Sequence, residues 1–310
     1  SENYSAGEVE IPLVVVRGAE PGPVLCLVAG IHGDELNGIE IVRRVIDGLQ
    51  PSDVRGTIIG APIVNLFGFW NQSRYLPDRR DLNRHFPGRA SGSTASRIAY
   101  GFWHEVVQRC THLIDFHTGS LHRSNLPQVR ADLSREDVAA LALAFGEKVV
   151  VHNPGQRHTL RSQAVAAGIA AILYEAGETM RFQKEHITAG VLGTKRVLQH
   201  LGMQRGSSPM TKKGQVFLET RWVRAKQGGI VELTPSLGDR VDKGDTVGVI
   251  TDPLRNAKGV VTTSAGGVVI GKVLAPTVVP GLALLHIGVL NGQMQQSEAG
   301  EEELEEERPE

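Results

Sequence analysis

The chain has 310 residues, of which 41% are hydrophobic and 22% charged, and its formal net charge is −1. This composition excludes a chain that is disordered throughout, and the 36 Gly and 15 Pro lack the three-residue period of collagen. No apolar run reaches the ~20 residues that a membrane-spanning helix needs. At roughly 150 residues per domain, the length predicts two domains.

The N-terminal residues, the cysteines and the distribution of charge indicate the compartment and the partners of the protein. Residues 1–10 are polar and acidic, which argues against a signal or transit peptide. The two cysteines, Cys26 and Cys110, lie in apolar stretches, as buried thiols do in a reducing compartment. We therefore expect a cytoplasmic protein with no membrane partner. Lys and Arg form no stripe with interleaved aromatic residues, so we also expect no nucleic-acid partner. The sequence is compatible with a homo-oligomer.

Strand-like and helix-like segments alternate through the first two hundred residues. In chain order we expect a strand at 24–29, a helix with an apolar stripe from Ile39 to Leu49, a strand at 57–64, a helix at 96–108, a strand at 113–116, a helix at 135–146, strands at 149–152 and 171–174, and a helix at 186–201. Asn37 and Glu40 have the spacing of a capping box for the first helix. This alternation predicts an α/β fold with a mixed central sheet flanked by helices.

The composition changes near residues 202–214, a polar stretch that contains Pro209. Beyond it, residues 228–250 and 266–287 both begin with two glycines and two β-branched residues and end in an apolar strand, which indicates an internal duplication. Short β-runs with Gly and Pro turns predict a small all-β domain of the barrel-sandwich type. We therefore expect a first domain at 1–205, a linker at 206–222, a β-domain at 223–290 and a disordered acidic tail at 291–310.

Residues with metal-binding chemistry follow two of the predicted strands. His32 and Glu35 come after the strand at 24–29, and their spacing lets an imidazole and a carboxylate converge on one point. His117 follows the strand at 113–116, where Asp115 could orient a ligand histidine. Two histidines, one glutamate and a water make a catalytic zinc site. His-x-x-Glu alone is weak support, because one such spacing arises by chance in a chain of this composition.

Two further segments predict substrate and proton chemistry. Asn83 and Arg84 stand side by side in a predicted loop, and a guanidinium with an adjacent amide suits a carboxylate. Glu175 ends the apolar strand at 171–174, where a carboxylate is costly to bury unless it is paired or used. A general base beside an activated water fits that position. Taken singly, each segment is also compatible with an ordinary structural role. The first would be a solvated basic loop, and the second a polar residue at the end of a strand.

The order of these motifs along the chain resembles the succinylglutamate desuccinylase/aspartoacylase family, a branch of the zinc carboxypeptidase fold with a small C-terminal β-domain. The resemblance covers about residues 10–290. It implies one zinc ion per chain, bound by His32, Glu35 and His117. It also implies that residues 1–205 are the zinc-dependent hydrolase domain, with Glu175 as the general base.

The resemblance extends to the residues that would bind substrate. Asn83 and Arg84 match the pair that holds the substrate carboxylate. The family also uses an upstream arginine to polarise the scissile carbonyl, for which Arg74 is our choice, with Arg79 as a further substrate-binding candidate and Arg79 or Arg80 as substitutes in the polarising role. Arg161 is the nearest match to an arginine that contacts acidic acyl groups, although its spacing to Glu175 differs from the family pattern.

The sequence therefore predicts a zinc-dependent amidohydrolase, a deacylase that cleaves the linear amide of an N-acyl amino acid or a related small carboxylate-bearing substrate by metal-activated water. The alternative is a zinc carboxypeptidase that trims acidic peptide C-termini, for which the arginines at 79, 80, 84 and 89 would be suitable. The expected partner is thus a small N-acyl amino acid or a short acidic peptide. The products distinguish the two activities, because a deacylase releases an acyl acid and a carboxypeptidase releases free amino acids from peptides.

Overall fold

In this computed structural model the described residues are 10–206, 214–255 and 257–290. They form two compact units, Ser1–Val216 and Phe217–Glu310, which we treat separately. The predicted linker at 206–222 includes residues outside the description, and its last part forms strands. The predicted acidic tail also lies outside the described residues. Within the described parts of the chain, no helix combines the length and apolar character needed to span a bilayer.

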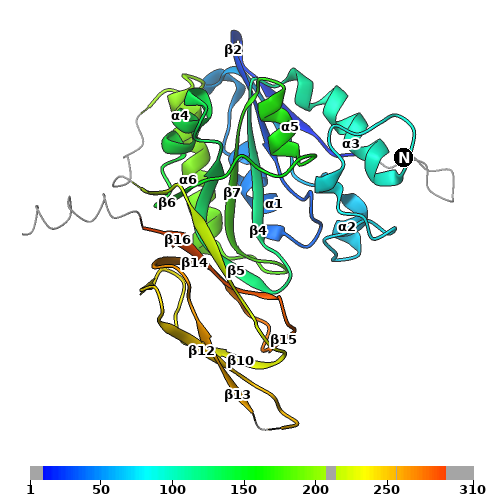
Figure 1. Ribbon diagram of the computed structural model, residues 1–310. Coiled ribbons are helices and arrows are strands. Elements are labelled where there is room, and N and C mark those ends of the chain that lie inside the picture. The colour runs from blue at the N-terminus through cyan, green and yellow to red at the C-terminus, as the bar shows by residue number, and fades with distance from the viewer. Residues whose placement is uncertain (1–9, 207–213, 256, 291–310) are drawn as a thin grey trace, which may run out of the picture. The chain divides into compact units, whose positions relative to one another are not determined.

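The first unit is an α/β unit, as predicted (Figure 1). Its strands are β1 (Val14–Arg17), β2 (Glu20–Val28), β3 (Arg55–Ala61), β4 (His112–Gly119), β5 (Arg123–Ala131), β6 (Val149–His152) and β7 (Ala170–Glu178), and β8 (Gln215–Phe217) begins at its end. Its helices are α1 (Leu36–Asp47), α2 (Leu66–Trp70), α3 (Thr94–Glu105), α4 (Glu136–Phe145), α5 (Leu160–Ala166) and α6 (Lys184–His200), with short 3-10 turns η1 (Pro51–Asp53), η2 (Leu82–Arg84) and η3 (Val107–Arg109).

The sheet of this unit is mixed. Strands β3, β2, β4 and β7 are parallel neighbours, β1 is antiparallel to β3, and β5 is antiparallel to β7 but parallel to β6. The parallel strands all end at one edge, where open α/β sheets bind their ligands. We did not predict β5, and its contribution to the site is described below.

Successive side chains of the central strands point alternately to the two faces of the sheet. Phe116 and Tyr174 are register partners on β4 and β7, and they face the layer of α1, α4 and α6. The next residue on each strand, His117 and Glu175, must therefore face the other side, because successive side chains alternate. Helix α5 lies over that second face, in front of the strands in Figure 1. Both faces contribute to the apolar core, and the second face carries polar residues at the carboxyl ends of β4 and β7.

The second unit is all-β, as predicted. Its strands are β9 (Thr220–Arg224), β10 (Gly229–Leu233), β11 (Arg240–Val241), β12 (Thr246–Thr251), β13 (Lys258–Thr262), β14 (Gly267–Val273), β15 (Thr277–Val278) and β16 (Ala283–Val289). They form two sheets with the orders β11-β14-β16-β9 and β13-β12-β10-β15. The two duplicated segments give equivalent antiparallel pairs, β10 with β12 and β14 with β16. Buried Val, Ile and Leu residues from both sheets form a separate core.

Candidate functional site

The loop between β2 and α1 carries two of the predicted ligands. Helix α1 begins at Leu36, so that Glu35 is its N-cap residue and Asn37 lies within the first turn. The predicted capping box is therefore wrong: Asn37 is buried, and its side chain accepts a hydrogen bond from the backbone N–H of Gln183 at 2.9 Å instead. A carboxylate at a helix N-terminus is stabilised by the helix dipole. The helix dipole therefore offsets part of the cost of burying the Glu35 carboxylate.

Gly33 lets this loop approach its neighbour closely. A Cβ atom at Gly33 would lie 1.9 Å from the carbonyl carbon of Gly68 in α2, a distance that no side chain can accept. The backbone N–H of Gly33 also donates to the carbonyl of Ser73 at 3.1 Å. This contact anchors the loop against the segment that leads to Arg74. The glycine between His32 and Glu35 is therefore needed for packing.

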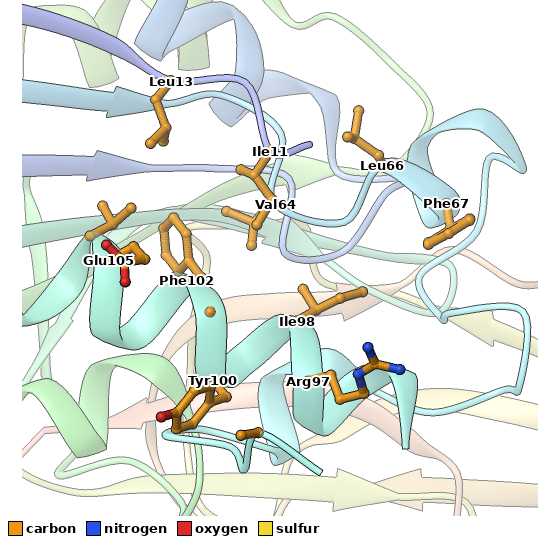
Figure 2. A pocket seen from close by; sticks show the side chains of 13 residues that line it. Ile11, Leu13, Val64, Leu66, Phe67, Arg97, Ile98, Tyr100, Phe102 and Glu105 are labelled. Carbon is orange, nitrogen blue, oxygen red and sulfur yellow. The ribbon is translucent and has the colours of Figure 1, made fainter. Parts of the chain in front are cut away.

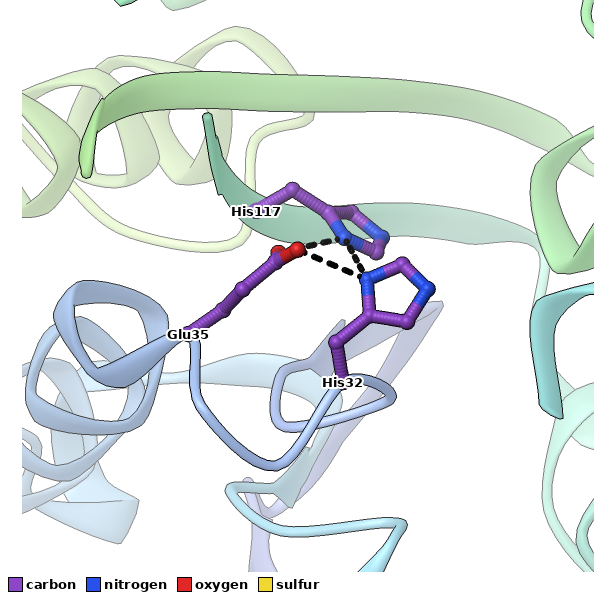
Figure 3. Close-up of side chains that lie close together, drawn as sticks. All are labelled: His32, Glu35 and His117. Carbon is purple, nitrogen blue, oxygen red and sulfur yellow. Dashed lines mark hydrogen bonds and ion pairs between the residues drawn. The ribbon is translucent and has the colours of Figure 1, made fainter. Parts of the chain in front are cut away.

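His32, Glu35 and His117 converge on one point, as Figure 3 shows. His32 Nδ1 lies 2.8 Å from Glu35 Oε1, His117 Nδ1 lies 2.8 Å from Glu35 Oε2, and the two Nδ1 atoms are 3.2 Å apart. All three residues are buried, and one ligand atom from each lies within 4.8 Å of the others. Burial opposes ionisation of Glu35, but the two imidazoles hold the pKa of its carboxyl well below the usual value. Three buried donors of these types form a candidate metal site.

Each histidine of this cluster has a carboxylate on its outer nitrogen. His117 Nε2 lies 3.0 Å from Asp115 Oδ2, and His32 Nε2 lies 3.2 Å from Asp81 Oδ1. Although burial disfavours a charged imidazole, Asp115 and Glu35 hold the pKa of His117 well above its usual value. Carboxylates in these positions fix the tautomer and orientation of metal-binding histidines. The contact of Asp115 with a histidine was predicted, whereas that of Asp81 was not, although Asp81 begins the Asp-Leu-Asn-Arg motif.

Among the predicted arginines, Arg74 is the one beside this cluster. Its Nη1 lies 3.3 Å from Glu35 Oε1, and its Nη2 donates to Asp81 Oδ2 at 2.8 Å. Burial works against its positive charge, but Glu35 and Asp81 raise its pKa. The structure does not bring Arg79 or Arg80 to the cavity: both are exposed, and Arg79 lines a separate hollow with Tyr75 and Leu76.

Glu175 faces the same cavity from β7, and both of its carboxylate oxygens are engaged. Arg130 Nη1 lies 2.9 Å from Glu175 Oε2, and the side-chain amide of Asn125 donates to Glu175 Oε1. Both partners come from β5, the strand that we did not predict. Its pattern was obscured by Pro127 and by polar residues on the side that faces the cavity. The signal in the sequence that could have identified β5 is a polar residue at every second position, as at Gln128 and Arg130.

The remaining predicted residues form another wall of the cavity. Asn83 is buried, and its Oδ1 accepts the backbone N–H of Leu160 at 2.8 Å. Arg84 is exposed and donates to the carbonyl of Asn83 at 2.7 Å. Arg161 is 4% exposed, and its two Nη atoms donate to Asn153, one to the carbonyl at 2.7 Å and one to Oδ1 at 2.9 Å. Burial lowers the pKa of Arg161 to about 10. Among the described residues, no carboxylate pairs with Arg84 or Arg161.

One cavity of about 240 Å³ brings most of these groups together. Its lining includes the three clustered residues, Arg74, Asn83, Arg84, Asp115, Arg130, Arg161 and Glu175. A second cavity, of about 460 Å³, is larger but mostly apolar. Figure 2 shows Ile11, Val64 and Phe102 around it, with Arg97 and Glu105 as its charged side chains. Because catalysis of polar reactions needs convergent polar and titratable groups, the smaller cavity is the candidate active site.

The fold is a mixed sheet flanked by helices, and one cavity holds a buried His-Glu-His cluster and the carboxylate of Glu175. These features define a candidate metal-dependent enzyme. The profile of the succinylglutamate desuccinylase/aspartoacylase catalytic domain matches residues 21–201, more than half of the chain. This protein therefore belongs to the succinylglutamate desuccinylase/aspartoacylase family.

Individual relatives agree with this assignment. The N-alpha-acetyl-L-2,4-diaminobutyric acid deacetylase of Halomonas elongata is 28% identical over 262 residues, which cover 81% of this chain and 76% of the relative. The product-bound ectoine utilization protein EutE (DoeB) of Ruegeria pomeroyi has a TM-score of 0.85 at 25% identity, covering 92% of this chain and 90% of that one. A succinylglutamate desuccinylase/aspartoacylase of Rhodobacter sphaeroides has a TM-score of 0.85 at 27% identity, covering 93% and 92%.

Proposed function

We propose that this protein is a zinc-dependent amidohydrolase that cleaves the amide bond of a small N-acyl amino acid. The observation that supports this most is the convergence in one cavity of the His32, Glu35 and His117 cluster, the Glu175 carboxylate and two arginines. These arginines are Arg84 and Arg161, which pair with no carboxylate among the residues that the structure describes. The curated relative that acts on an N-acetylated amino acid supports the same substrate class. The cavity volume of about 240 Å³ favours a small substrate over a peptide.

The donor set is suited to zinc. Two imidazole nitrogens and a carboxylate, all buried and with ordered partners on the far side of each ring, are typical of a catalytic zinc site with an open position. A zinc ion held by these residues would lower the pKa of a water molecule towards ~7 and polarise the substrate carbonyl. We propose one zinc ion per chain, bound by His32, Glu35 and His117.

We assign proton transfer, charge stabilisation and substrate binding to the surrounding side chains. We assign Glu175 as the base that accepts a proton from the attacking water and returns it to the leaving amine. We assign to Arg74, beside Glu35, the stabilisation of the negative charge that develops on the carbonyl oxygen. The amide of Asn83 and the guanidinium of Arg84 would hold the substrate carboxylate near the scissile bond.

Arg161, which is buried and lines the cavity, would add a second subsite that binds an anionic group. Arg161 is almost fully buried and pairs with no carboxylate in the described part of the chain, which is costly for a guanidinium, and burial lowers its pKa to about 10. A carboxylate on the substrate would neutralise it. We therefore propose that the substrate carries a second acidic group, on either its acyl or its amino-acid part.

Metal content and product identity test this function. We expect one zinc ion per chain, and release of the acyl acid from a panel of N-acetyl and N-succinyl derivatives of acidic, basic and neutral amino acids. The variant Glu175→Ala should keep its zinc and lose turnover, and full activity in that variant would contradict the assignment. Stepwise loss of C-terminal residues from acidic peptides, with no turnover of the panel, would instead show a carboxypeptidase.

A further inference from the structure

We propose that Arg130 and Asn125 are positioning residues for Glu175, which together clamp its two carboxylate oxygens in the orientation that proton transfer requires. This inference rests on the proposed role of Glu175 and adds two residues to it. Arg130 lies 2.9 Å from Oε2 of Glu175, and Asn125 donates to Oε1. Both residues come from β5, whereas the clustered residues lie in the loop before α1 and on β4, and Glu175 lies on β7.

An irregularity in β5 makes the clamp possible. Asn125 and Arg130 are five residues apart, and in a regular strand an odd separation directs two side chains to opposite faces. The register between β5 and β7 shifts between Asn125, which pairs with Gly177, and Gln128, which pairs with Glu175. Such a bulge turns a side chain to the other face and is common beside active sites. Both side chains can therefore reach one carboxylate.

The arginine of the clamp is itself held in place. Arg130 Nε donates to Gln128 Oε1 at 3.1 Å, so the guanidinium is tethered along its own strand while Nη1 meets Glu175. Its side chain is 19% exposed and that of Glu175 is 12% exposed, so the pair is largely screened from water. Partly buried pairs with ordered geometry restrict rotation far more than exposed pairs do. The Glu175 carboxylate is thus fixed before substrate arrives.

The clamp predicts a specific kinetic signature. A residue that only positions the base contributes in the transition state, so its loss should lower kcat and kcat/KM equally and leave KM nearly unchanged. A residue that binds the substrate carboxylate would raise KM instead. We expect Arg130→Met to lower kcat by roughly 10- to 100-fold, the usual effect of losing an outer partner in a metal site. Arg130→Lys keeps the charge without the planar fork and should recover part of the loss.

The experiment uses the full-length zinc-loaded protein and the N-acyl amino acid that the panel identifies. Arg130→Met, Arg130→Lys and Asn125→Ser are compared with wild type for kcat, KM, zinc content and melting temperature. The matched control is Arg181→Met, because Arg181 is an exposed arginine that pairs with another β7 glutamate, Glu178, at 3.1 Å. It should leave all four quantities unchanged. Asn125→Ser removes the partner of the other oxygen without a change of charge, so the proposal can be tested even if Arg130→Met does not fold.

The outcomes separate the inference from the proposed function. A fall in kcat at constant KM and full zinc content, with partial recovery in Arg130→Lys, supports the clamp. Unchanged kcat in both Arg130→Met and Asn125→Ser, or a rise in KM alone, overturns it and leaves the proposed function intact. Full activity in Glu175→Ala contradicts the proposed function itself.

Discussion

His117 and Glu175 are register partners on the parallel strands β4 and β7, and their side chains face the same side of the sheet. This pairing joins the candidate metal cluster to the candidate base through two adjacent strands of the central sheet. Because strand positions are held by the hydrogen-bond ladder, the separation of the two groups depends on side-chain length and side-chain orientation.

The variant Glu175→Asp tests that dependence. Shortening the side chain by one methylene withdraws the carboxylate from the cavity and from its partners on β5, so we expect kcat to fall by about 100-fold, at the low end of the contribution of a general base. Zinc content should be unchanged, since Glu175 is not among the clustered residues. Steady-state kinetics with metal analysis checks this, and an equal loss of zinc would show that Glu175 supports the metal site.

Asp81 is expected to control metal affinity. Burial opposes its charge, but His32 and Arg74 hold the pKa of its carboxyl well below the usual value. Asp81→Asn weakens the contacts to His32 Nε2 and Arg74 Nη2 at once, and we expect zinc affinity to fall by about 10- to 100-fold. Competition with a chromophoric chelator measures this. Asp78→Asn is the control, because Asp78 is an exposed neighbour that pairs with Arg80. Equal affinity in the two variants would refute the role of Asp81.

Arg161 should determine substrate affinity. The variant Arg161→Met keeps the buried aliphatic volume and removes the charge, so a substrate with a second carboxylate loses a charged hydrogen bond of about 1.5–3 kcal/mol. That corresponds to a rise in KM of roughly 10- to 150-fold. Neutral N-acyl amino acids should be affected little. If KM rises equally for acidic and neutral substrates, the second anionic subsite does not exist.

Gly33 should tolerate no side chain. In Gly33→Ala the new methyl group would overlap the backbone of Gly68, so the loop with His32 and Glu35 must move. We expect a loss of about 1–3 kcal/mol in the free energy of unfolding, together with weaker zinc binding. Chemical denaturation and metal titration measure the two effects. Gly101→Ala, a helical position with open space around the added Cβ, provides the control and should not destabilise the protein.

The lowered pKa of His112 predicts one part of the pH dependence of the stability of the protein. Burial lowers its pKa below the ordinary value of 6.5, with His200 contributing in the same direction and Asp137 opposing. The unfolded chain therefore binds a proton more readily than the folded chain. Stability from this residue is present above pH 6.5 and is lost as the pH falls from 6.5 through the lower pKa of the folded state. Denaturation midpoints at pH 8 and pH 5.5 measure the effect. The variant His112→Gln should lose less stability between these two values than wild type, and an identical loss would contradict the prediction.

Much of the fold and part of the site could be predicted from sequence. Long periodic segments such as α6 and the apolar cores of β2, β4 and β7 were placed correctly, because hydrophobic periodicity is a local signal. The three clustered residues were identified because each follows a predicted strand or falls in a recognisable motif. Strand β5, by contrast, has Pro127 and polar residues in its interior, and its pairing with β7 is a long-range contact that no local pattern reports.

The sequence alone therefore determined the fold class, the family resemblance and the chemistry of the residues at the ends of β2, β4 and β7. The tertiary structure decided which side chains meet: Arg74 rather than Arg79 beside the cluster, Asp81 behind His32, and Arg130 with Asn125 on Glu175. The physical reason is that residue type and periodicity are encoded locally. The partners of a buried charge are instead fixed by strand register, bulges and loop packing, which depend on segments far apart in the chain.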